Sequence, residues 1–321
     1  MRRFVLPLVV GLLPPTAAAQ DKIYRIAVLE REPSTANAPN FAALRQGLRE
    51  LGYVEGKNLA IGYRSADGRD ERYPELCADA VKHADLIIVR GTAPARACMR
   101  ATKTVPILFS GVDDPVAEGL VADVGRPGGN VTGLMYTSSP VVAAARLDFL
   151  REVFPRITTL AAMINLGKPE FARQRAYLET AGRDLGIAVR VFDVRTLPDL
   201  QTAFALAAGE RLEAVYVPVD ELTMVNRKLV AQLGLRHRLP VVTTEQAFVE
   251  AGGLLSYGAD ATAQYKRLAS ITDRILRGGK VGEIPVERPT IFILSVNLKT
   301  ARALRVSIPR QVLSRADRVI Q

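Results

Sequence analysis

The chain has 321 residues, of which 48% are hydrophobic, and its formal net charge is +10. A chain of this length without a long polar tract is globular, has room for two domains of ordinary size, and is not intrinsically disordered. Cationic and anionic residues are interspersed, and Trp is absent. Nucleic-acid binding normally needs a concentrated basic face, so the composition argues against a nucleic-acid partner.

The N-terminal stretch has the features of a secretory signal peptide. Arg2 and Arg3 give a basic start, an apolar run too short to span a membrane follows, and three alanines ending at Ala19 offer a cleavage site. We expect residues 1–19 to be removed, which lowers the net charge from +10 to +8 through the loss of two arginines. The first cysteine is Cys77, far from the cleavage site, so we predict a soluble periplasmic protein and not a lipoprotein.

Short apolar runs alternate with helical stretches through the first half of the chain. The apolar runs are continuous, which is typical of parallel strands that are covered on both faces of a sheet. The expected strands are 24–29, 59–64, 86–89 and 107–110, and the expected helices are 41–51, 71–82 and the segment that follows Thr92.

The two cysteines, Cys77 and Cys98, fall on successive expected helices of this half. In an oxidising compartment they form a disulfide if those helices lie side by side on one face of the sheet. Two buried thiols are the alternative, because spacing in the sequence does not fix the geometry.

The same alternation restarts after the polar stretch near residue 137. The expected strands are 160–165, 188–194, 214–219, 240–244, 253–258 and 290–297, and the expected helices are 141–153, 170–186, the segment after Pro198, 224–234, 261–277 and 298–304. Polar stretches mark three natural crossings, at 136–140, 257–260 and 285–289.

This pattern predicts an α/β fold of two Rossmann-like lobes with parallel sheets, joined by a three-crossover hinge. We expect an N-terminal lobe of residues 22–136 plus 258–289 and a C-terminal lobe of residues 137–257 plus 290–321. Ligands of open α/β sheets bind beyond the carboxyl ends of the strands. Two such edges that face one another predict a cleft for a solute.

Cofactor and metal motifs are missing from the sequence. The Gly-rich stretch 125–133 precedes a strand and lacks the Lys-Ser/Thr ending of a phosphate loop. His83 and His237 have no metal-ligand spacing, and there is no GxSxG motif of a serine hydrolase. We therefore predict neither a cofactor nor a metal site.

The pairs Asp113-Asp114 and Asp220-Glu221 are the best candidates for enzyme chemistry. Two such carboxylates suit an extracytoplasmic hydrolase or lyase. A turn or helix-cap role is the alternative, because aspartates commonly cap helices and stabilise turns.

Polar groups follow the strands at the edge that α/β sheets use for binding. They are Gly91-Thr92, Asp114, Asn165, Asp220 and Thr244-Glu245. A helix N-terminus with a hydroxyl suits a carboxylate, and Asp220 suits an ammonium. The combination predicts a zwitterion that resembles an amino acid, although each residue alone is also explained by helix capping.

Six segments of the chain carry a resemblance to a known family. They are "LRQGLRELGYVEGKNLAIGYRSADG" (44–68), "PILFSGVDDPVAEGLV", "RPGGNVTG", "VYVPVDE", "EAGGLLSYGAD" and "NLKTARALRVSIPRQVLSRAD". From about residue 24 to the C-terminus the chain resembles the ABC-transporter substrate-binding family whose better-known members bind tryptophan or tyrosine. The resemblance implies a type I periplasmic-binding fold, a solute held in the hinge cleft, no catalysis, a membrane ABC permease as partner, and a monomer. A sensor-only binding domain is the alternative within this class.

The family's motifs are carried over residue by residue. The resemblance implies that Gly91, Thr92 and Ala93 meet a carboxylate and that Asp220 meets an amine. Phe41, Tyr136, Phe171 and Tyr257 are the candidates for stacking on an aromatic ring. The predicted ligand-binding residues are Gly91, Thr92, Ala93, Asp114, Asn165, Asp220, Thr244, Glu245 and Tyr257.

Overall fold

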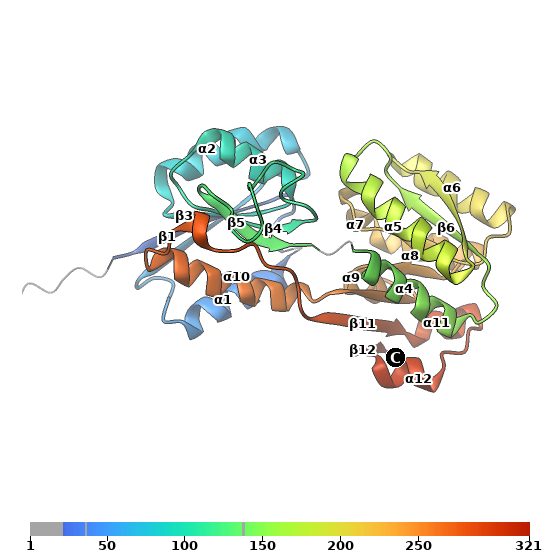
Figure 1. Ribbon diagram of the computed structural model, residues 1–321. Helices are drawn as coiled ribbons and strands as arrows, with labels where there is room; N and C mark the ends of the chain where they lie inside the picture. Colours follow the sequence, from blue (N-terminus) through green and yellow to red (C-terminus); the bar gives the residue numbers. More distant parts are fainter. Residues whose placement is uncertain (1–21, 36, 137–138) are drawn as a thin grey trace, which may run out of the picture.

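The computed structural model describes residues 22–35, 37–136 and 139–321, and within them the chain forms two α/β lobes side by side (Figure 1). The sheet of the N-terminal lobe has the order β2-β1-β3-β4-β5 with every neighbouring pair parallel. Its strands are β1 (Tyr24–Glu30), β2 (Leu59–Ser65), β3 (Leu86–Arg90), β4 (Ile107–Val112) and β5 (Val131–Met135). The predicted signal peptide, 1–19, lies outside the described residues.

Helices cover both faces of this sheet, as its continuous apolar strands require. On one face α1 (Ala38–Glu50) packs against α10 (Ala261–Leu276), a helix from late in the chain, around Leu44, Leu48 and Leu268. On the other face lie α2 (Tyr73–His83), preceded by the short helix η1 (Asp70–Arg72), and α3 (Thr92–Ala101).

The helices α2 and α3 lie side by side, and the disulfide Cys77–Cys98 joins them. Both cysteine side chains are fully buried, and the described residues hold no free cysteine. Of the two alternatives that the sequence left open, the disulfide is therefore confirmed, and the pair of buried thiols is wrong.

The sheet of the C-terminal lobe has the order β12-β11-β10-β9-β8-β6-β7. Its strands are β6 (Thr159–Ile164), β7 (Ala188–Asp193), β8 (Val215–Val217), β9 (Val241–Thr243), β10 (Leu255–Ala259), β11 (Phe292–Asn297) and β12 (Arg318–Ile320). The expectation of a purely parallel sheet is wrong at β10 and β11, which are antiparallel. The reason is topological: β10 leads out of this lobe toward the other, and β11 enters again from that side.

Two helical layers cover this second sheet. Its helices are α4 (Pro140–Val153), α5 (Pro169–Leu185) and α12 (Arg310–Arg315) on one face, α6 (Leu197–Gly209), α7 (Glu221–Val225), α8 (Arg227–His237) and α9 (Gln246–Glu250) on the other, and α11 (Leu298–Leu304) at the end of β11. Each layer has its own apolar core, centred on residues such as Leu147 and Leu150 on one face and Phe204 and Val230 on the other.

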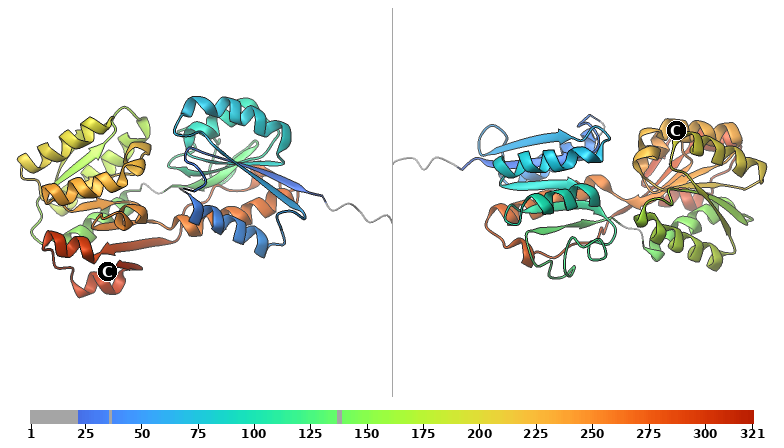
Figure 2. Two further views of the ribbon diagram at one scale, coloured as in Figure 1. Left: turned by 180° about the vertical axis from the view of Figure 1, so that it is seen from behind. Right: turned by 90° about the horizontal axis from the view of Figure 1, so that it is seen from above.

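The chain passes between the lobes three times, and the second and third passages lie side by side in Figure 2. The first lies between β5 and α4, the second follows β10 at Asp260, and the third joins the short helix η2 (Val281–Glu283) to β11. Residue Glu287, on the third passage, bridges to Leu134 at the end of the N-terminal sheet. The fold class is thus confirmed as two α/β lobes with mostly parallel sheets. No helix among the described residues is long and apolar enough to cross a membrane.

Candidate binding cleft between the lobes

A cleft of about 430 Å³ lies between the two lobes. It is bounded by loops at the carboxyl ends of β1, β3 and β4 from one lobe and of β6, β8 and β9 from the other. The residues of the second lobe that line it are Lys168, Phe171, Gln174, Val219, Asp220, Met224 and Glu245. Those of the first lobe include Glu30, Tyr73, Arg90, Gly91, Thr92, Ala93, Pro94, Asp113 and Tyr136. This is the edge at which open α/β sheets bind ligands.

The N-terminus of α3 opens into this cleft. Strand β3 ends at Arg90, and Gly91 turns the chain with φ +96°. Glycine adopts this backbone conformation readily because it has no Cβ atom, whereas other residues rarely do. Because Gly91 is the N-cap residue of α3, no capping side chain occupies the amides of the first turn. Thr92 and Ala93 line the cleft beside these amides. An uncapped helix N-terminus of this kind attracts an anion.

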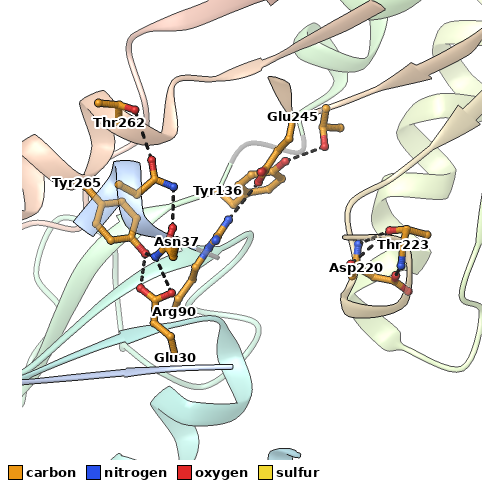
Figure 3. A network of polar contacts seen from close by, with 11 residues as sticks. Glu30, Asn37, Arg90, Tyr136, Asp220, Thr223, Glu245, Thr262 and Tyr265 are labelled. Carbon is orange, nitrogen blue, oxygen red and sulfur yellow. Dashed lines mark hydrogen bonds and ion pairs between the residues drawn. The ribbon is translucent and has the colours of Figure 1, made fainter. Parts of the chain in front are cut away.

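Glu30 lies buried at the end of β1, with an exposed fraction of 3%. Its carboxylate accepts hydrogen bonds from Asn37 Nδ2 at 2.7 Å, from the Tyr63 hydroxyl at 3.4 Å and from the Tyr265 hydroxyl. Burial raises the pKa of Glu30, and the nearby Arg90 guanidinium opposes that shift. Since Tyr265 belongs to α10, the helix that returns after the second passage completes this wall of the cleft (Figure 3).

Arg90 extends from this buried network to the opposite lobe. Its guanidinium donates to Glu245 Oε1 at 3.1 Å, as Figure 3 shows. Burial lowers the pKa of Arg90, but the negative charges of the Glu245 and Glu30 carboxylates outweigh burial and raise it. Beside this pair the Tyr136 hydroxyl donates to Thr244 Oγ1 at 2.9 Å.

The helix α5 makes further contacts across the cleft. Arg173 pairs with Asp114 and lies 3.7 Å from Glu118 Oε1, and Gln174 Nε2 donates to Asp113 Oδ2 at 3.1 Å. The two lobes therefore meet through polar side chains on two sides of the cleft.

Five of the residues predicted from the sequence line the cleft together: Gly91, Thr92, Ala93, Asp220 and Glu245. Asp220 stands at the start of α7, where its carboxylate accepts the backbone N–H of Thr223 at 2.7 Å (Figure 3). It therefore caps its own helix while it lines the cleft.

The other four predicted residues are not among those that line the cleft. Asp114 accepts the backbone N–H of Ala117 at 3.0 Å, and Asn165 Oδ1 accepts that of Gly167 at 3.0 Å. Thr244 is 6% exposed and accepts from Tyr136, and Tyr257 packs its ring on Phe149 and Phe292. Their roles in binding stay predictions. Of the four stacking candidates, Tyr136 and Phe171 line the cleft.

Three of the charged and polar side chains that build the cleft walls were not predicted, namely Arg90, Tyr265 and Arg173. The sequence does contain an indication for Arg90, because a single arginine ends the apolar strand "LIIVR" at the edge where ligands bind. For Tyr265 and Arg173 the sequence contains no such indication, since each contacts a partner far away in the sequence.

Two α/β lobes with three connections, an open helix N-terminus and a polar cleft at facing strand ends define a bilobal binding protein. The chain belongs to the ABC transporter substrate binding protein family, whose model matches residues 26–320. Its role is therefore that of the solute-binding component of an ABC transporter, outside the cytoplasm.

Known proteins of similar sequence or structure fit this family. A tyrosine-binding protein of Clostridioides difficile is 26% identical over 290 residues, covering 90% of this chain and 82% of that protein. An ABC domain in complex with L-Trp from Streptococcus pneumonia has a TM-score of 0.85 and 24% identity, covering 93% of this chain and 100% of that one. The ligand-free, open structure of a substrate binding protein with adhesive properties from Clostridium difficile has a TM-score of 0.74 with the same identity and coverage.

Proposed function

We propose that this protein captures an amino acid with an aromatic side chain in the interlobe cleft and delivers it to a membrane ABC permease. The observation that carries the proposal is the uncapped N-terminus of α3, which faces carboxylates on the opposite wall of the cleft. That arrangement provides for both charges of a zwitterion.

The solute's carboxylate binds at the first turn of α3. Gly91 leaves the amides of this turn accessible, and the Thr92 hydroxyl adds a donor beside them. The partial positive charge of the helix N-terminus favours an anion at this point.

The solute's ammonium binds among the carboxylates of the cleft. The lining residues include seven acids and three cations, although the chain as a whole is strongly basic. Asp220 and Glu245 come from the second lobe, so an ammonium held by them and a carboxylate held by α3 tie the lobes together.

Two observations support an aromatic side chain. Tyr73, Tyr136 and Phe171 contribute ring surface to the cleft, and Met224 and Val219 add apolar area. One relative is named a tyrosine-binding protein, and one structural neighbour holds L-Trp.

Solute capture works through hinge closure. A solute that contacts both lobes only when they are close together shifts the open–closed equilibrium toward the closed form. The cross-lobe contacts of Arg90, Tyr136 and Arg173 favour that form, and the TM-score is higher to the L-Trp complex than to the ligand-free, open structure. The permease then recognises the closed protein.

The buried disulfide supports export to an oxidising compartment, in keeping with a cleaved signal peptide and a periplasmic location. We do not propose an enzymatic activity, because Asp114 and Asp220 each accept a backbone amide three residues further along the chain.

Calorimetric titration with matched analogues tests this function. L-tyrosine carries both charges, tyramine lacks the carboxylate, and 3-(4-hydroxyphenyl)propionic acid lacks the ammonium. We expect binding of L-tyrosine or L-tryptophan and a loss of about 1–3 kcal/mol for either deletion, since a buried partner is left unpaired. If either analogue bound as tightly as the amino acid, the proposal that the cleft recognises both charges of a zwitterion would be wrong.

The variant Asp220→Asn refines the test. Asparagine is also a good N-cap, so α7 persists while the negative charge is lost. Affinity for the amino acid should fall by about 1–3 kcal/mol, whereas Asp184→Asn, at an exposed position of α5, should leave it unchanged. Equal affinity of the two variants would remove Asp220 from the site.

A further inference from the structure

Three helices of the C-terminal lobe are followed by an arginine in the left-handed backbone conformation. Arg211 follows the end of α6 with φ 59°, Arg238 ends α8 with φ 56°, and Arg305 ends α11 with φ 58°. Glycine is the usual residue at such positions, because a Cβ atom is disfavoured in this conformation.

The helix dipole does not by itself account for two of these arginines, Arg238 and Arg305. A cation near a helix C-terminus is stabilising, but α8 and α11 already carry Arg236 and Arg302 in their last turns. A strained backbone that persists where glycine would relieve it points to a use for the side chain.

The topology brings these helix ends to one edge of the lobe. Helix α6 leads into β8, α8 leads into β9, and the antiparallel strand β11 leads into α11, which contacts α8. Asp220 and Glu245 follow the opposite ends of β8 and β9 and line the cleft. The arginines therefore lie on the side of the lobe away from the cleft.

We call the exposed cations at this place the basic edge: Arg211, Arg236, Arg238, Lys299, Arg302 and Arg305. Within the described ranges none of the six lies within ion-pair distance of a carboxylate. The nearby acids are engaged elsewhere, since Glu210 pairs with Arg190 at 3.3 Å and Glu213 accepts the backbone N–H groups of Thr158 and Thr159 at 2.8 Å.

Exposed leucines accompany these cations. Leu206 in the last turn of α6 is 50% exposed, and Leu235 in the last turn of α8 is 38% exposed. Cations that meet phosphate groups together with apolar side chains that enter the headgroup region are the composition of a membrane-binding surface. A partner that offers only acidic groups would account for the cations but not for the leucines.

We propose that the basic edge docks the protein onto an anionic phospholipid bilayer. Docking by this edge keeps an exported binding protein at the membrane surface and leaves its cleft accessible to solute. The proposal does not depend on which solute the cleft binds.

Flotation with lipid vesicles tests the docking. The full mature chain is mixed with phosphatidylglycerol-containing vesicles or with pure phosphatidylcholine vesicles, at low and at high salt. The test variant is Arg211→Gly, Arg238→Gly and Arg305→Gly combined. Glycine suits the backbone of all three positions, so thermal stability should be kept or raised while the charge is lost.

A control variant removes the same charge from the matching edge of the other lobe. Lys57, Lys103 and Arg126 are exposed and precede β2, β4 and β5, and each becomes Gln. We expect salt-sensitive binding of the parent to the anionic vesicles only, a loss of at least about tenfold in the glycine variant, and no comparable loss in the control.

Three results would overturn the proposal. The first is no preference of the parent chain for anionic vesicles. The second is an equal loss in the control variant, which would mean that overall charge alone decides. The third is binding of soluble poly-glutamate as tight as that of the vesicles, which would indicate an acidic protein as the partner.

Discussion

The two walls of the cleft are built in different ways. The N-terminal wall holds Glu30 and Arg90 within a network of its own lobe, where Asn37, Tyr63 and Tyr265 donate to the buried carboxylate. The C-terminal wall presents Asp220, which caps its own short helix, and Glu245, which reaches across to Arg90. One wall is fixed before the lobes approach, and the other gains a main contact only when they do.

This difference indicates an order of events in solute capture. A side chain that is already immobilised loses little conformational entropy when a ligand arrives, so preorganised groups bind at a lower cost. The N-terminal wall, with α3 anchored beneath it, is therefore the first half of the site, and the C-terminal wall closes on the solute.

The largest expected effect comes from the disulfide, which is confined to the N-terminal lobe. Cys77→Ser combined with Cys98→Ser opens a loop with a sequence separation of 21, and the free energy of unfolding of that lobe should fall by about 3 kcal/mol. Denaturant titration, followed by a probe in each lobe, measures it. The transition of the C-terminal lobe serves as the internal control, and equal shifts in both lobes would contradict an independent N-terminal wall.

A smaller effect is expected from the ion pair that joins the walls. Arg90→Met leaves the buried Glu30 without its nearby cation and should lower the free energy of unfolding by about 2 kcal/mol. Glu245→Gln removes the same cross-lobe pair but leaves Arg90 beside Glu30, so its cost should stay below about 1 kcal/mol.

Chemical denaturation of the two variants, side by side, ranks them. The asymmetry follows from placing the buried charge in the N-terminal wall only. Equal losses for Arg90→Met and Glu245→Gln would mean that the contact between lobes, and not the buried network, is what Arg90 stabilises.

Much of the fold was predictable because it depends on local patterns. Continuous apolar runs such as 86–89 and helix stops such as Gly186 lie in the sequence itself, and they correspond to β3 and to the end of α5. The antiparallel direction of β11 was not predictable, because it depends on the side from which the chain enters the sheet, and a strand's own residues carry no such information.

The cleft shows the same limit. Gly91, Thr92 and Ala93 were found from the sequence because a strand, a turn and a helix follow one another there. Glu30 was not among the predicted residues, since its donors Asn37, at the start of α1, and Tyr265, on α10, come together only in the folded lobe. Asp114 was predicted to bind solute, and this stays a prediction; its ion pair with Arg173 of α5 was not predictable, because it is set by how the lobes approach.

The smallest expected effect is a pH dependence that belongs to the N-terminal wall. Burial raises the pKa of Glu30 above its ordinary value of 4.5. Between that value and the native pKa, the folded protein keeps a proton that the unfolded chain has lost, so the free energy of unfolding falls as pH rises through this window. In Glu30→Gln this contribution should vanish, because glutamine does not titrate. In Tyr265→Phe the window should extend to higher pH, because the Tyr265 hydroxyl opposes the shift by stabilising the carboxylate. Urea denaturation at a series of pH values compares the three proteins, and an unchanged pH slope in Glu30→Gln would place the ionisation elsewhere.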